Sequence, residues 1–221
     1  MAEARLDDWE NIVSAHINGA PQPVMMDAVR DAAITFCRDS RIDRRWVRTL
    51  PYDAARPDTL IPDGDDGAFP GTVIEVWSRC GQVHARTMVD IRSRYPDGYM
   101  RELADTPRDI WGWISLRPGQ ITLVPTPRYS LPDEFAIVAA YQPKRNAVSV
   151  PHFLYEMYAH EIGWGALAIL HAHDQAPYAT PSKAGGFMTM FRESIMLAAH
   201  RGDGGFGKQR LRTVGERVAR R

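Results

Sequence analysis

The residues best suited to chemistry in this 221-residue sequence are three histidines and a glutamate between positions 160 and 173. They are His160, Glu161, His171 and His173. A metalloprotease helix requires two histidines four positions apart, because only then do both rings face one metal ion. Trp164 occupies the position four residues after His160, and His171 would lie about 16 Å from His160 along a helix. We therefore expect no metal site and interpret the cluster as polar helix surface or a subunit contact.

Arrangements for nucleophilic catalysis and phosphate binding are also missing from the sequence. There is no Gly-x-Ser-x-Gly turn, and Cys37 lies on the apolar face of an expected helix, where a thiol packs as a small hydrophobic group. The glycines of 202–207 follow a helix and lack the Gly-Lys-Ser/Thr ending of a phosphate-binding loop. We therefore expect no enzyme activity, no catalytic residue and no cofactor-binding site.

Charge and composition exclude further classes of protein. Lys and Arg number 27 and so do Asp and Glu, which gives a net charge of zero and argues against a general polyanion binder. A hydrophobic fraction of 44% is typical of a folded, soluble protein. No apolar run approaches the roughly 18 residues of a membrane span, and residues 1–8 do not resemble a secretory signal. With only Cys37 and Cys80 and no disulfide framework, we expect synthesis in a reducing cytoplasm.

Two helices are expected at the N-terminal end of the chain. Apolar residues about one helical turn apart predict a short amphipathic helix over 6–18. After a break at residues 19–23, a second helix is expected over about 23–41. Its apolar face consists of Met25, Val29, Ala32, Ala33, Phe36 and Cys37.

The middle of the chain has a β-strand pattern. Strands are expected over 73–77 and 135–141, with partial alternation over 83–88 and a short helix near 91–95. A hairpin is expected to join 111–116 to 121–124 through Pro118 and Gly119, the pair typical of a type II turn. The stretch 51–71 is rich in Pro, Asp and Gly and is expected to form a long loop.

Two further helices are expected after Pro151. Gly163 and Gly165 in the first of them leave room for another helix to approach closely. Thr180 and Pro181 predict the start of the last helix, which should end near residue 202. The expected fold is therefore α+β: a bundle of about four helices from 1–45 and 151–202, a β-rich inserted domain over 46–150, and an extended C-terminal arm over 203–221.

The C-terminal tail differs from the rest of the chain in charge. Residues 201–221 contain seven basic and two acidic residues, so they carry +5 and residues 1–200 carry −5. Too few large apolar side chains are present for this segment to fold alone. It is either a solvated end or a segment that becomes ordered on a partner. Leu211, Val214 and Val218, at spacings of three and four, favour docking on a partner.

Several motifs carry a family resemblance through their order and spacing. They are Gly19-Ala20-Pro21, Val29-Arg30-Asp31-Ala32-Ala33-Ile34-Thr35-Phe36-Cys37-Arg38, Pro118-Gly119-x-Ile121-x-Leu123-x-Pro125-x-Pro127, Ala140-Tyr141-Gln142-Pro143, Phe153-Leu154-Tyr155 and Gly165-Ala166-Leu167-Ala168. Together they resemble the head-to-tail adaptor, or connector, proteins of tailed bacteriophages and prophages. The resemblance extends over about 15–212, and the sequence departs from the family mainly in 51–71 and in its last ten residues.

The resemblance implies a structural role in the virion. It implies a helix bundle that assembles with its copies into a ring, commonly of twelve, beneath the portal protein in the neck between head and tail. The β-rich part would face the tail or the nozzle and stopper proteins. DNA would pass through the channel of the ring and contact it only transiently. No membrane partner is expected. Such particles are assembled in the host bacterial cytoplasm.

The resemblance also assigns the C-terminal arm to portal docking. The expected docking residues are Arg201, Phe206, Lys208, Arg210, Leu211, Arg212, Val214, Arg217 and Val218. The alternative function is a nucleic-acid-binding protein that uses the basic tail. A DNA-binding protein is expected to carry basic residues on a folded face as well, so the charge of −5 on residues 1–200 favours the adaptor.

Overall fold

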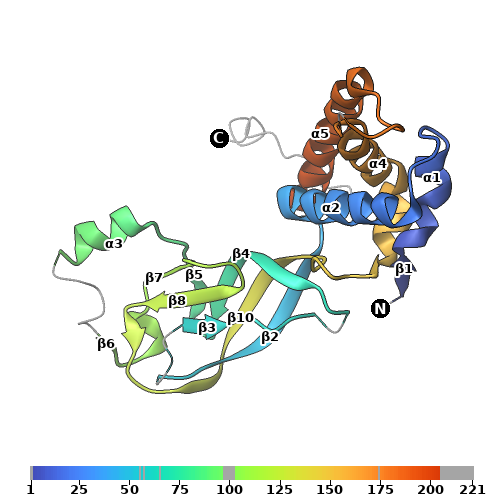
Figure 1. Cartoon of the computed structure of the whole chain (residues 1–221). Coiled ribbons are helices and arrows are strands. Elements are labelled where there is room, and N and C mark those ends of the chain that lie inside the picture. Colours follow the sequence, from blue (N-terminus) through green and yellow to red (C-terminus); the bar gives the residue numbers. More distant parts are fainter. Residues whose placement is uncertain are drawn as a thin grey trace, which may run out of the picture.

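The computed structural model of the protein describes residues 2–54, 56, 58–64, 66–96, 103–173 and 175–204. The expected α+β fold is confirmed: a helix bundle and a β-rich unit lie at opposite ends of an elongated molecule (Figure 1). The helices are η1 (Leu6–Trp9), α1 (Glu10–Ser14), α2 (Gln22–Ser40), α3 (Met88–Arg94), η3 (Pro107–Asp109), α4 (His152–His171) and α5 (Pro181–Gly204). The strands are β1 (Glu3–Arg5), β2 (Arg44–Tyr52), β3 (Asp58–Leu60), β4 (Phe69–Ser78), β5 (Gly81–Val83), β6 (Leu103–Ala104), β7 (Gly112–Ile114), β8 (Gln120–Val124), β9 (Thr126–Pro127), β10 (Leu131–Gln142) and β11 (Ser149–Pro151).

The core of the bundle is formed by the faces that the helical period predicts. α2 packs against both α4 and α5, and its expected apolar face is buried. Phe36 lies at the centre, with its ring 5.0 Å from that of Tyr158 and 6.2 Å from that of Phe191. Cys37 is fully buried beside it, and burial raises the pKa of its thiol, so this side chain packs as a hydrophobic group.

Two glycines of α4 allow the neighbouring helices to approach. A Cβ at Gly163 would lie 2.8 Å from Ile12 Cγ2, and a Cβ at Gly165 would lie 2.7 Å from the Phe191 ring. Contacts this short do not occur between real side chains, so both positions require glycine. The expected close packing on this helix is confirmed, and it places α4 between α1 and α5.

The first expected helix, over 6–18, is not a single continuous helix. The structure has a 3-10 turn, η1, followed by the short α1, although Leu6, Trp9, Val13 and Ile17 are all buried as expected. The residues before it form β1, which pairs antiparallel with β11. This pairing joins residues far apart in the sequence and has no local signal.

The β-rich unit consists of two main sheets around one core. The described strands form one sheet in the order β2-β10-β4-β5 and another in the order β3-β8-β7. The expected hairpin is confirmed: β7 pairs antiparallel with β8, and Gly119 has the positive φ of 71° that its turn requires. The strand over 135–141 is confirmed as part of β10, which lies at the centre of the larger sheet.

Two local expectations for this unit are wrong. The stretch 51–71 is not a single long loop, because it holds the end of β2, all of β3 and the start of β4. β3 forms by pairing with β8, where Thr122 donates a hydrogen bond to Asp58 at 2.6 Å. The alternation over 83–88 does not continue as a strand: β5 ends at Val83, and Thr87 caps α3 by accepting from the Asp90 amide.

Candidate assembly surfaces

Most of the expected portal-docking residues lie outside the described residues. These are Phe206, Lys208, Arg210, Leu211, Arg212, Val214, Arg217 and Val218. Arg201 is described and is exposed on α5. That helix continues to Gly204, past the expected end near residue 202. The expected end of this helix near residue 202 is therefore two residues too early. Near this end, Asp203 forms an ion pair with Arg44 of β2.

The structure separates the histidines of the expected polar cluster. His160 is exposed, whereas His171 is buried with its ring stacked on Phe187 at 5.6 Å. Thr180 donates its backbone N–H to His171 Nδ1 at 3.1 Å. In the part of the chain that the structure describes, no group of three or more His, Cys, Asp or Glu side chains could hold a metal ion.

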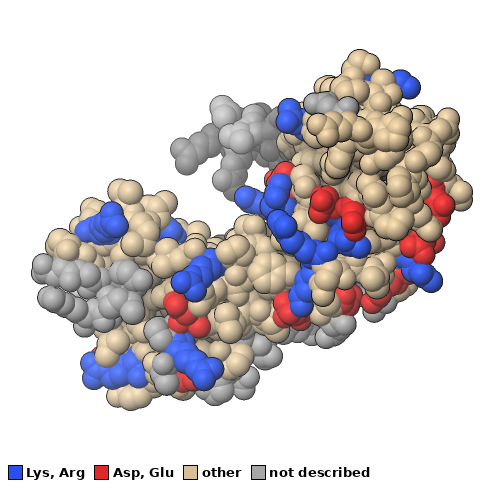
Figure 2. Space-filling model, in the orientation of Figure 1, with Lys and Arg blue, Asp and Glu red and all other residues tan. Residues whose placement is uncertain are grey.

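The outward side of α5 exposes large apolar side chains together with the charges of Arg192 and Glu193. We define the α5 outer face as Gly185, Gly186, Met190, Met196 and Leu197. Met196 and Leu197 are 62% and 61% exposed, and Met190 is 36% exposed. In Figure 2 the upper part of the bundle, around the adjoining ends of α4 and α5, shows few charged side chains, whereas charges gather along α2 and toward the β-rich unit.

The glycines of the α5 outer face have no packing role within the described part of the chain. A Cβ at Gly185 or Gly186 would meet nothing within 4 Å, and neither residue has a positive φ. Each glycine in a helix interior costs about 1 kcal/mol relative to alanine. In contrast to Gly163 and Gly165, these two residues weaken their helix without allowing a contact inside the described part of the chain.

A groove lies on the opposite side of α4. We define the α1–α4 groove by its lining residues, which are Ile12, His152, Tyr155, Glu156, Met157, Ala159, His160 and Glu161. Its volume is about 660 Å³. The lining combines apolar residues such as Ile12, Met157 and Ala159 with two carboxylates and two histidines, but neither lysine nor arginine.

A buried ion cluster lies where the chain enters the β-rich unit after α2. We define the junction cluster as Asp43, Arg45, Asp66 and Tyr141. The Arg45 guanidinium donates to Asp43 at 2.9 and 2.6 Å and to Asp66 at two distances of 2.7 Å. It also lies 4.7 Å from the centre of the Tyr141 ring. This arrangement joins the start of β2, the loop before β4 and the end of β10.

Electrostatics in the junction cluster follow from one cation shared by two buried carboxylates. The hydrogen bond from Arg45 lowers the pKa of Asp66. Burial raises the pKa of Asp43, and the negative charge of Asp66 adds to this, although Arg45 acts in the opposite direction. A Cβ at Gly64 would collide with Arg45 Nη1 and Asp66 Oδ1, so a larger residue at this position would displace these side chains from their ion pair.

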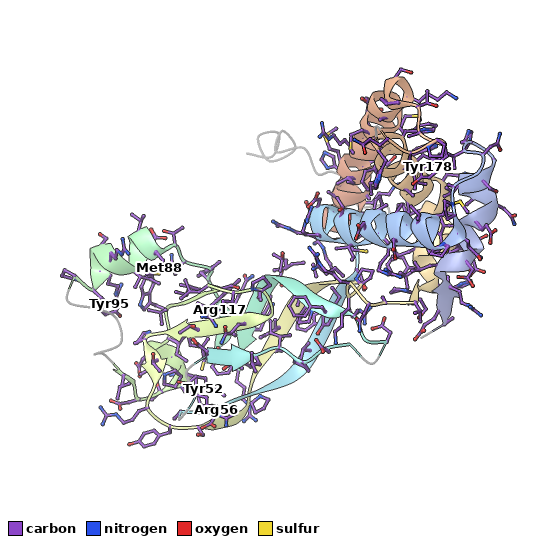
Figure 3. All side chains as sticks on the ribbon, viewed as in Figure 1. Tyr52, Arg56, Met88, Tyr95, Arg117 and Tyr178 are labelled. Atoms are coloured by element: carbon purple, nitrogen blue, oxygen red, sulfur yellow. The ribbon has the colours of Figure 1, made fainter. Side chains whose placement is uncertain are left out.

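A group of arginines and aromatic rings lies at the far end of the β-rich unit. We define the α3 cluster as Arg86, Arg92, Arg94, Tyr95 and Trp111. The guanidinium carbons of Arg86 and Arg94 lie 4.6 and 4.9 Å from the Trp111 ring centre, and Trp111 Nε1 donates to the Tyr95 hydroxyl at 3.0 Å. Figure 3 shows Met88 and Tyr95 at this end of the molecule, far from Tyr178 in the bundle. The arrangement can bind an acidic surface.

The sequence analysis did not predict the α5 outer face, the α1–α4 groove, the α3 cluster or the buried junction cluster. The pair Gly185-Gly186 inside an amphipathic helix was a visible signal for the α5 outer face. By contrast, Arg45 and Asp66 lie on different elements, and no local pattern joins them.

None of the described helices is both long and apolar enough to span a membrane. No protein-family model and no curated protein matches the chain.

Proposed function

We propose that the protein is a structural head-to-tail adaptor of a tailed bacteriophage or prophage. Its copies form a ring between the portal and the tail, and the ring surrounds the channel through which DNA leaves the head. The bundle provides the contacts between copies, the β-rich unit faces the tail, and the residues after 204 dock on the portal.

The observation that supports this proposal best is the pairing of two different units through a fixed junction. A bundle that exposes large apolar side chains on α5 lies at one end of the molecule, and a β-rich unit lies at the other (Figure 1). The junction cluster fixes the start of β2 within the β-rich unit, with all three charged side chains at most 12% exposed. The ion pair between Arg44 and Asp203 and the packing of α2 against β10 connect this unit to the bundle. A protein that transmits position from one ring of partners to another needs such rigidity, whereas two independent domains on a linker would not supply it.

The alternative, a nucleic-acid-binding protein, is favoured by the α3 cluster. Arg86, Arg92 and Arg94 provide the basic group on a folded surface that a DNA binder is expected to have in addition to a basic tail. DNA retention that falls steeply with salt, and that is lost in an Arg92→Glu, Arg94→Glu variant, would favour this function.

The adaptor function is tested by a joining reaction. Heads assembled without this protein and filled with DNA are mixed with purified tails, with and without the purified chain, and infectious particles are counted. If the chain is the adaptor, heads and tails should join only when the chain is added. Joining at the same frequency without the chain would contradict the proposal.

A further inference from the structure

We infer that residues 205–221 pack into the α1–α4 groove of their own chain while the chain has no partner. The occupant of the groove is therefore the basic tail, and any partner of the tail must displace it from there. This inference concerns the free chain and goes beyond the proposed function, because it holds whether or not the tail later docks on a portal.

The groove lies on the side of the bundle that carries the negative charge of the body. β1, η1 and α1 all pack against α4, and Trp9 Nε1 of η1 donates to the Ala159 carbonyl at 2.9 Å. Residues 3–14 and 152–161 of these elements contain six carboxylates and one cation, Arg5, so their net charge is −5. This equals the net charge of residues 1–200, so the remainder of those residues is neutral in sum. Figure 2 shows Asp and Glu side chains along this side of the bundle.

The tail has the opposite charge and an apolar pattern that suits a groove. Residues 205–221 contain six basic side chains and one carboxylate, which gives a net charge of +5. Leu211, Val214 and Val218 recur at spacings of three and four, the pattern of a segment that lays one apolar face into a groove. The groove offers apolar wall residues such as Ile12, and its lining contains neither lysine nor arginine. Apolar contact and opposite charge therefore favour the same occupant.

The tail begins at the end of the bundle where the groove lies. His171 of α4 stacks on Phe187 of α5, and Gly165 lies against Phe191, so the two helices run antiparallel and α5 ends near the start of α4 (Figure 1). The α4 part of the groove lining falls within 152–161, the first half of that helix. The 17 residues of the tail span up to about 55–60 Å when extended, whereas a helix is only about 10–12 Å across. The tail is therefore long enough to pass α4 and enter the groove of its own copy.

The contact should form within one chain and should be sensitive to salt. Exposed ion pairs are individually weak and are screened by salt, so the contact relies on several of them acting together. Attachment to the same chain gives the tail an effective concentration of about the millimolar range at the groove. At micromolar protein, this concentration exceeds that of tails from other copies. A partner with a stronger acidic surface would still displace the tail.

Disulfide crosslinking tests the contact. Of the two cysteines in the chain, Cys80 is exposed and is removed by Cys80→Ser, whereas Cys37 is buried. The test chain then carries Val214→Cys in the tail and Met157→Cys in the groove. The matched control carries Val214→Cys with Met196→Cys on the α5 outer face, where the native side chain is 62% exposed against 42% for Met157. Both chains are oxidised at micromolar concentration, non-reducing electrophoresis separates single chains from crosslinked pairs, and mass spectrometry of peptides quantifies each disulfide.

We expect the disulfide between positions 157 and 214 to form within single chains, in several-fold higher yield than that between 196 and 214. High salt should lower this yield to that of the control, and so should the added pair Glu156→Lys, Glu161→Lys. Asp31→Lys with Glu193→Lys reverses two exposed carboxylates outside the groove lining and should leave the yield unchanged.

Three results would overturn the inference: equal yields from the two cysteine pairs, a yield that neither salt nor charge reversal in the groove lowers, and a disulfide formed between chains. Thermal melting checks that every variant is folded, and the salt series needs no charge variant at all. The joining reaction tests the adaptor function separately, so either proposal can fail while the other holds.

Discussion

At the scale of single residues, the glycines of this chain fall into two groups with opposite consequences. Gly64, Gly163 and Gly165 are required by contacts inside the protein, because an added Cβ would collide with a neighbour. Gly185 and Gly186 meet no neighbour within 4 Å and have helical backbone. The first group is set by packing within one copy, whereas the second group makes no such contact with the described residues.

The first prediction compares one glycine of each group. Gly64→Ala should lower the free energy of unfolding by about 1–3 kcal/mol, because the methyl group displaces the Arg45 guanidinium from Asp66. Gly186→Ala should raise it by up to about 1 kcal/mol through better helix propensity. Urea unfolding of the monomer measures both. If Gly186→Ala destabilised the monomer, then α5 would already have a partner at this position within one copy.

The second prediction concerns His171. Burial, together with the positive charge of Lys183 and His16, lowers the pKa of its imidazole below the usual 6.5. The unfolded chain therefore binds a proton at a pH where the folded chain does not, so this residue stabilises the fold above pH 6.5 and less as the pH falls. Wild type should lose more stability between pH 7 and pH 5 than His171→Gln, as measured by urea unfolding at each pH. Equal losses would show that another group controls the acid response.

At the scale of elements, local periodicity predicted the helices and central strands, and long-range pairing decided the rest. α2, α4 and α5 follow the expected ranges because each buries an apolar stripe that repeats with the helical period. β1 and β3 were missed because each is three residues long and forms only through a distant partner strand. The junction cluster was missed for the same reason, since Arg45 meets Asp66 only after the sheet has formed.

The third prediction tests the orientation of α5. Phe191 and Leu167 are buried in the bundle core, so Phe191→Asp or Leu167→Asp should unfold the bundle. An unpaired buried charge costs several kcal/mol, against a total stability of about 5 to 15 kcal/mol. Met196→Asp on the exposed side of α5 is the matched control and should melt cooperatively, close to wild type. Circular dichroism melting compares the three, and a folded Phe191→Asp protein would show that the helix faces the other way.

At the scale of the whole molecule, we expect the folded body and the tail to have separate roles. Among the described residues, the helices form one hydrophobic core, the sheets form another, and Ile91, Ile114 and Val124 form a smaller third. Residues 205–221, which follow α5, carry a net charge of +5. The body supplies shape, and we expect the tail to supply attachment.

The fourth prediction separates these roles by truncation. Deleting residues 205–221 keeps α5 and the ion pair between Arg44 and Asp203, so the melting temperature of the body should stay almost unchanged. The truncated chain should nevertheless fail to bind portal-bearing heads, as measured by co-sedimentation. Normal binding to heads, or loss of the fold, would refute the docking role of the tail.

The central claim is that copies of this chain build a ring around a channel. The most direct measurement is electron microscopy of the purified full-length chain at high concentration, with class averages viewed along the particle axis. We predict closed rings with rotational symmetry and an open centre, with the bundles in contact around the circumference. A uniform population of monomers or of two-fold symmetric pairs would contradict the account.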